Sequence, residues 1–181
     1  MLTESAYRQL ISSYRGNSLL ADIPASLVDL WCNDYYSSNP SAELFQVNLK
    51  SSNTAFTYLF DIPLQRTIVA YGVPVFSKVP RDPGRMAGHP NSGGPSFHRG
   101  HLIAHSIGGG TDINLVPQLG KLNIGQFRIL EKYVRSLAEQ NRASLYFVRP
   151  IYTDKSQTPA MFEQCVLVPP KSLTYALHKN S

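Results

Sequence analysis

The sequence has no run of about 18 apolar residues, so no membrane-spanning helix is expected. The first ten residues, MLTESAYRQL, carry an early glutamate and no apolar centre, so we expect no signal peptide. The protein would then stay in the cytoplasm or be delivered by a secretion system without a classical leader. Only two cysteines occur, Cys32 and Cys165, far apart and in no CxxC pattern, which favours buried free thiols over a disulfide.

The composition predicts a folded protein with a strongly asymmetric charge. The 181 residues are 43% hydrophobic, long and apolar enough to bury a core within one domain. The net charge of +5 is uneven: residues 1–65 hold three basic and six acidic side chains, whereas residues 66–181 hold fourteen basic and six acidic ones. A basic second half suits a polyanionic partner such as nucleic acid.

Hydrophobic periodicity and turn residues divide the chain into predicted elements. Thr3 is the expected cap of the first helix, and Pro24 is the expected first residue of the second. The predicted helices span 3–15, 24–33 and 122–140; the predicted strands span 43–50, 56–62, 66–76, 97–107, 144–152 and 162–169, with 111–119 short and extended. Residues 77–96 read as a loop, and the tail 171–181 as a short helix or a frayed end.

Groups able to move protons and hold phosphate are concentrated in residues 98–131. In an extended strand, alternate side chains share a face, so Arg99 and His101 would lie together, with Gly100 leaving bare backbone between them for a substrate to approach. A neutral imidazole can take a proton from water near pH 7. A guanidinium beside it can hold a phosphate oxygen through two hydrogen bonds.

The three histidines of this stretch also suggest a zinc site. His98, His101 and His105 superficially resemble metal-ligand spacing, which would make the chain a zinc-stabilised interaction domain. Strand alternation weakens this interpretation, because it turns His98 away from His101.

The predicted helix 122–140 places an amide and a carboxylate near its start. Its apolar stripe contains Phe127, Leu130, Val134 and Leu137, and Asn123 falls on the same stripe. Asn123 is either a capping or core hydrogen-bonding residue, or a carbonyl ligand for a hard cation such as Mg²⁺. Glu131 lies about 12 Å further along such a helix. It would reach metal-bound water, or be a surface glutamate paired with Lys132 or Arg135.

Several ordered motifs resemble the DNA/RNA non-specific endonucleases of the ββα-metal, or His-metal finger, type. The motifs are RGH at 99–101, NLVPQ at 114–118, and LNIGQF at 122–127 followed by Glu131, and the resemblance covers roughly residues 97–150. It implies an α+β fold: a ββα-metal nuclease core with a central antiparallel sheet. We expect a single nuclease domain over 1–181, with a helical N-terminal extension (1–45) and a catalytic core (46–170).

The resemblance also implies a role for each matched residue. His101 would be the general base, Asn123 the direct metal ligand and Arg99 the group that steadies the scissile phosphate, while Glu131 would hold the metal's water shell and Asn114 would support the site. Candidate substrate-binding residues are Arg81 or Arg85 in the loop, and Arg128. One position departs from the family: His98 stands where the family has aspartate. We expect this change to modulate activity without abolishing it.

The implied activity is metal-dependent hydrolysis of DNA and/or RNA to 5′-phosphate products with little sequence preference. Mg²⁺ is the expected cofactor, with Mn²⁺ or another divalent cation as a substitute. The resemblance to this family further suggests that the chain is the toxin domain of a bacterial effector. An immunity or inhibitor protein is then a candidate partner. The main alternative is a non-catalytic nucleic-acid-binding module on a nuclease scaffold.

Overall fold

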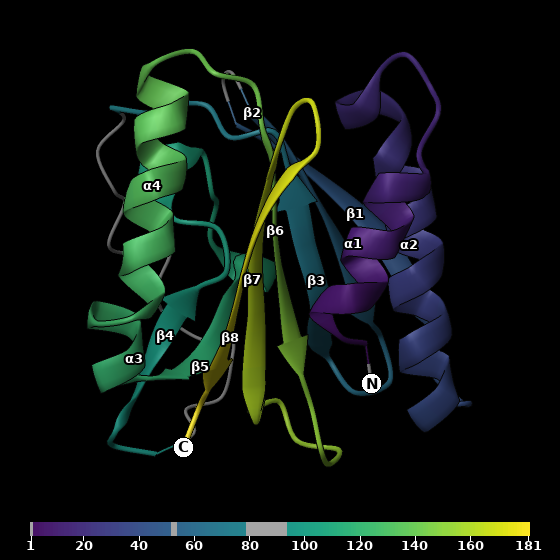
Figure 1. Ribbon diagram of the computed structural model, residues 1–181. Helices are drawn as coiled ribbons and strands as arrows, with labels where there is room; N and C mark the ends of the chain where they lie inside the picture. The colour runs from purple at the N-terminus through teal and green to yellow at the C-terminus, as the bar shows by residue number, and fades with distance from the viewer. Residues whose placement is uncertain (1, 52–53, 79–93) are drawn as a thin grey trace.

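A six-stranded antiparallel sheet runs through the centre of the computed structural model, which describes residues 2–51, 54–78 and 94–181 (Figure 1). The strand order is β1-β2-β3-β6-β7-β8, and every neighbouring pair is antiparallel. The strands are β1 (Leu44–Ser51), β2 (Thr54–Asp61), β3 (Arg66–Gly72), β6 (Leu145–Ile151), β7 (Met161–Val168) and β8 (Ser172–Lys179). A separate two-stranded sheet pairs β4 (Phe97–His101) with β5 (Leu115–Leu119). The expected α+β class with a central antiparallel sheet is confirmed.

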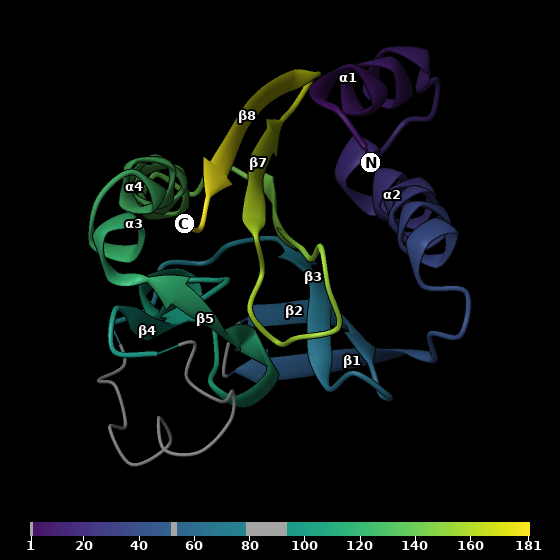
Figure 2. The same cartoon turned by 90° about the horizontal axis from the view of Figure 1, so that it is seen from below.

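Each face of the large sheet carries its own hydrophobic core, because strand side chains alternate between faces. Along β6, Leu145 and Phe147 belong to one core, whereas Tyr146 and Val148 belong to the other. Helices α1 (Glu4–Ser13) and α2 (Leu19–Ser38) cover the first face. Helix α4 (Phe127–Glu139) and the small sheet cover the second, so the sheet lies between two layers (Figure 2).

A buried ionic network fastens the N-terminal helices to the sheet. The Arg149 guanidinium on β6 donates to Glu163 Oε2 on β7 and to Asp34 Oδ2 on α2, each at 2.6 Å. The Tyr7 hydroxyl on α1 donates to the same Glu163 oxygen at 2.7 Å. Both helices are therefore held by directional contacts as well as by apolar packing.

Helix α2 is longer than the sequence predicted. It begins at Leu19 and ends at Ser38, so the prediction that it starts at Pro24 and ends at residue 33 is wrong. Its buried residues recur every four positions and form one continuous stripe against the sheet: Leu19, Ile23, Leu27, Trp31 and Tyr35. This packing outweighs the local cost of a proline inside a helix. In α1, Thr3 occupies the cap position but makes no capping hydrogen bond.

Three further boundaries differ from the prediction. Strand β3 ends at Gly72 rather than at residue 76. The tail forms β8, an edge strand paired with β7 along its whole length, because its alternate residues complete both cores. The strand expected over 97–107 stops at His101 and is followed by a 3₁₀ turn, η2 (His105–Ile107). A second turn, η3 (Asp112–Asn114), precedes β5.

Both cysteines are free, as expected, with Cys165 buried and Cys32 half-buried. Among the described residues, no helix has the length and apolar character needed to span a membrane.

Candidate active site

Five of the predicted site residues line one cavity of about 270 Å³. They come from β4, from α3 (Gly120–Ile124) and from α4. The full lining is Arg99, His101, Ala104, Asn123, Ile124, Arg128 and Glu131. An imidazole, a carboxylate, an amide and two guanidinium groups therefore meet in one space, although 32 positions separate the first of these residues from the last. The predicted loop arginines, Arg81 and Arg85, lie outside the described residues.

Arg99 and His101 lie on the same face of strand β4 and both line the cavity, as the alternation of side chains along a strand predicted. Gly100 between them is not a point of substrate approach, so that prediction is wrong. Gly100 is buried, and a Cβ added to it would lie 2.2 Å from Gln118 Oε1 on β5. The missing side chain makes room for Gln118 instead.

The loop after β4 is held by Asn114, whose side chain is fully buried. Its Oδ1 accepts a hydrogen bond from the Ile103 amide at 2.9 Å. Its Nδ2 donates to the carbonyls of Ile103 at 2.9 Å and Gly110 at 2.7 Å. Asn114 does not line the cavity. It fixes the backbone that follows His101.

The triple glycine allows the same loop to turn tightly. Gly108 adopts a left-handed conformation with φ 98°. Gly109 lies so close to the chain that an added Cβ would be 1.8 Å from the Ile103 carbonyl oxygen. These contacts explain why residues 102–107 leave the extended path. The alternation of side chains expected along an extended strand over 97–107 therefore ends at His101.

The predicted single helix 122–140 is two helices, α3 and α4, separated at Gly125. The apolar stripe of α4 is buried as predicted, but Asn123 belongs to α3 and is only half-buried. The axial separation of Asn123 and Glu131 inferred from one continuous helix therefore does not apply. The bend between the helices brings both side chains to the same cavity.

The carboxylate of Glu131 lies close to a buried phenol behind the cavity. Burial raises the pKa of Tyr146 well above its ordinary value, and the negative charge of Glu131 raises it further. The Tyr146 hydroxyl oxygen accepts a hydrogen bond from Gln164 Nε2 at 2.8 Å. Tyr146 therefore stays neutral and belongs to the same hydrophobic core as the buried residues of α4.

The histidines of residues 98–105 do not form a zinc cluster. Among the described residues, no group of three or more His, Cys, Asp or Glu side chains is placed to hold a metal. His105 belongs to η2 and does not line the cavity. The side chains of the lining that could hold a divalent cation through oxygen are the amide of Asn123 and the carboxylate of Glu131.

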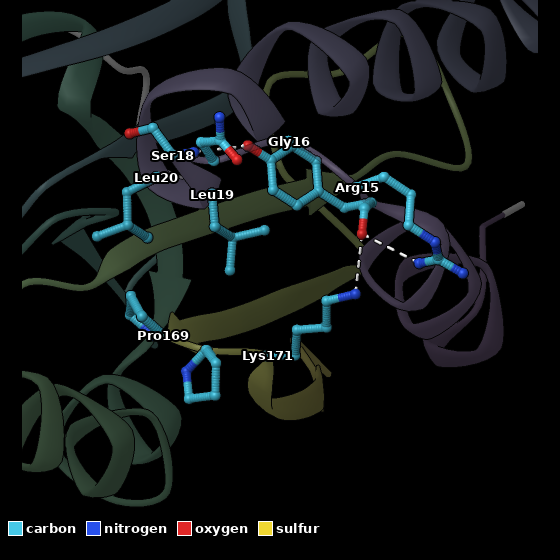
Figure 3. Close-up of a pocket in the computed structure, with 10 residues that line it drawn as sticks. Arg15, Gly16, Ser18, Leu19, Leu20, Pro169 and Lys171 are labelled. Atoms are coloured by element: carbon cyan, nitrogen blue, oxygen red, sulfur yellow. Dashed lines mark hydrogen bonds between the residues drawn. The ribbon is translucent and has the colours of Figure 1, made fainter.

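A larger cavity of about 650 Å³ lies on the other side of the molecule, between the α1–α2 turn and the β7–β8 turn (Figure 3). Its two cations are engaged by backbone: the Lys171 ammonium donates to the carbonyls of Ser12 and Tyr14, and the Arg15 guanidinium donates to the same two carbonyls. No histidine and no carboxylate lines it.

One residue that positions the site was missed from sequence. Asn180 follows β8, in the tail that was expected to be a short helix or frayed. Its Oδ1 accepts from the Leu119 amide at 2.7 Å, and its Nδ2 donates to the Pro117 carbonyl at 3.1 Å. These bonds attach β5, and with it the start of α3, to the end of the main sheet. A single asparagine in a polar tail gives no sequence signal of such a role.

Known proteins resemble the chain in sequence and in fold. Residues 77–166, about half of the chain, match the model of the family described as DNA/RNA non-specific endonuclease. No curated protein matches the chain. A solved structure of an extracellular endonuclease has a TM-score of 0.55 at 16% identity, covering 78% of this chain and 91% of its own. A structure of Sda1 nuclease with a bound zinc ion has a TM-score of 0.55 at 15% identity, covering 80% and 85%.

These structural likenesses show the fold, a ββα-metal nuclease fold in which β4, β5 and α3 form the ββα unit. The family match covers that unit together with α4, β6 and most of β7. The chain therefore belongs to the DNA/RNA non-specific endonuclease family.

Proposed function

We propose that the protein is a divalent-metal-dependent endonuclease that hydrolyses DNA and/or RNA with little sequence preference. The observation that carries this proposal is the shared cavity, which His101, Arg99, Asn123 and Glu131 all line. In this proposal the cationic and amide groups of the lining hold the phosphate and the metal, so sequence-independent contact with the phosphate backbone is the expected mode of binding.

His101 is the proposed general base. Its half-exposed imidazole lines the cavity and can take a proton from a water molecule beside the scissile phosphate. The water oxygen then forms a bond to phosphorus while the bond from phosphorus to the 3′ oxygen breaks. The products are a 5′-phosphate and a 3′-hydroxyl, whose oxygen takes a proton from solvent.

Arg99 and Arg128 are the proposed phosphate-binding groups. They reach the cavity from β4 and α4 respectively, and both side chains are exposed at its rim. Two guanidinium groups at one phosphodiester can hold separate oxygens and stabilise the extra charge of the transition state.

Asn123 and Glu131 are the residues that would hold the metal, Asn123 directly through Oδ1 and Glu131 through water. A bound Mg²⁺ supplies positive charge to the phosphate and the leaving oxygen. Because both donors are oxygens, we propose Mg²⁺ as the cofactor, with Mn²⁺ able to substitute.

Digestion of supercoiled plasmid and of a structured RNA, in Mg²⁺ with and without EDTA, tests the proposal. His101→Ala should lower the cleavage rate by about 10²–10⁴-fold, the usual contribution of a general base. His105→Ala is the matched control, because this histidine lies outside the cavity lining, and it should cleave within a few-fold of the unaltered protein. Nucleic-acid binding without cleavage in any divalent metal would instead favour the non-catalytic module.

A further inference from the structure

The histidine that replaces the family aspartate contacts the proposed metal ligand. His98 lies on β4, and its Nδ1 is 3.3 Å from Nδ2 of Asn123 on α3. Strand alternation turns His98 away from the cavity face of β4, and it does not line the cavity. It contacts Asn123, which does line the cavity.

The imidazole lies close to Gly120, the first residue of α3. A Cβ added to Gly120 would lie 2.8 Å from Nε2 and 3.1 Å from Cε1 of His98. The ring therefore lies directly against the Gly120 backbone, where any side chain would displace it. The Gly120 amide also donates to the Ser96 carbonyl at 2.9 Å, which fixes the start of α3 against the chain entering β4.

The contact between His98 and Asn123 can decide which end of the Asn123 amide faces a cation in the cavity. A carboxamide has one acceptor end and one donor end, and rotation by 180° exchanges them at little steric cost. If Nδ1 of His98 accepts from Nδ2, Oδ1 is left for the cavity. In the reverse orientation the NH₂ group would face the cavity, and it cannot bind a cation.

We propose that His98 is a positioning residue that accepts a hydrogen bond from Asn123 Nδ2 and so directs Asn123 Oδ1 toward the divalent cation. The inference rests on the proposed function, in which Asn123 is the direct metal ligand. It also explains how the site can tolerate histidine in place of aspartate, since both side chains offer an acceptor at this position.

The test measures Mn²⁺ affinity by electron paramagnetic resonance on the full chain, without substrate. His98→Ala should raise the Mn²⁺ Kd about 10-fold, the lower end of the usual loss when the partner of a metal ligand is removed. His98→Asp should restore most of the affinity, because a carboxylate also accepts from Nδ2. Ser96→Ala, an exposed position two residues earlier, is the matched control and should leave the Kd unchanged.

The Asn123→Asp variant separates an effect of His98 on the orientation of the amide from its other effects on metal binding. Asn123→Asp replaces the amide with a carboxylate that presents oxygen at either end, so adding His98→Ala there should change the Kd by less than about two-fold. Gly120→Ala should mimic His98→Ala by displacing the ring, and should add nothing further when His98 is already alanine.

The outcomes distinguish the inference from the function on which it rests. If Asn123→Ala weakens Mn²⁺ binding but His98→Ala does not, the positioning role is wrong and the metal ligand stands. If His98→Ala weakens binding equally in the Asn123→Asp background, His98 acts by another route and the inference is overturned. If Asn123→Ala leaves the Kd unchanged, the metal assignment in the proposed function fails as well.

Discussion

Asn114→Ala tests whether the loop after the proposed general base is held by one buried side chain. The substitution removes three hydrogen bonds, two to Ile103 and one to Gly110, at distances of 2.7 to 2.9 Å. At about 1 kcal/mol net for each bond, the free energy of unfolding should fall by about 3 kcal/mol. The loss will be larger if water cannot reach the backbone groups left behind.

For a chain of this length, a loss of about 3 kcal/mol lowers Tm by roughly 6–12 °C. The assay is urea denaturation followed by the fluorescence of Trp31, the only tryptophan of the chain, which is fully buried on the side of α2 that packs against the sheet. Thermal melting followed by circular dichroism gives the shift in Tm independently.

Asn123→Ala is the matched control, because it removes the same side chain from a half-buried position at the cavity. It should change the free energy of unfolding by less than about 0.5 kcal/mol while abolishing tight Mn²⁺ binding. Asn114→Ala should lower the free energy of unfolding but keep tight Mn²⁺ binding, measured at a temperature where the variant remains folded. An Asn114→Ala protein within about 1 kcal/mol of the unaltered chain would refute the role assigned to this asparagine.

Three further perturbations have definite expected results. Gly109→Ala should lower the free energy of unfolding by about 1–3 kcal/mol, because its Cβ would overlap a backbone oxygen, whereas Gly110→Ala, with nothing nearer than 4.0 Å, should be tolerated in the same urea titration. Arg149→Met should cost about 3–5 kcal/mol, since it leaves two carboxylates without their buried cation. Burial lowers the pKa of His178 below its ordinary value of about 6.5. The unfolded chain therefore binds the proton first, and stability present above pH 6.5 should be lost as the pH falls through the folded pKa. His178→Gln should flatten that part of a stability–pH profile.

Local pattern predicted most strands, and local pattern together with the family resemblance predicted five of the seven residues that line the cavity. Alternation along β4 was enough to place Arg99 and His101 together, and the apolar stripe of α4 was read correctly. The errors arose where distant contacts decide the structure. Packing of α2 against the sheet carries the helix through Pro24, and pairing with β7 turns the tail into a strand.

The break at Gly125 shows why site geometry was harder to predict than site composition. Glycine inside an apolar helical pattern is usually tolerated, so the sequence favoured one helix. In the structure, Gly125 has φ −105° and ψ −111°, and an added Cβ would lie 2.5 Å from the Lys121 carbonyl oxygen. The chain bends there, and the bend brings Asn123 and Glu131 into one cavity.

The ββα unit depends on the rest of the fold, because a two-stranded sheet is marginally stable alone. The unit and the adjoining η3 and α4 are joined to the large sheet at separate points: Asn180 binds the backbone of β5, the Thr67 hydroxyl on β3 donates to the Ile113 carbonyl, and Gln164 on β7 donates to the Phe127 carbonyl at the start of α4. Two of these anchors lie in strands whose other face packs against α1 and α2. The N-terminal helices contribute no side chain to the cavity lining, yet they stabilise the strands that hold it. Loss of the helices should therefore reduce activity through the geometry of the site rather than through its chemistry.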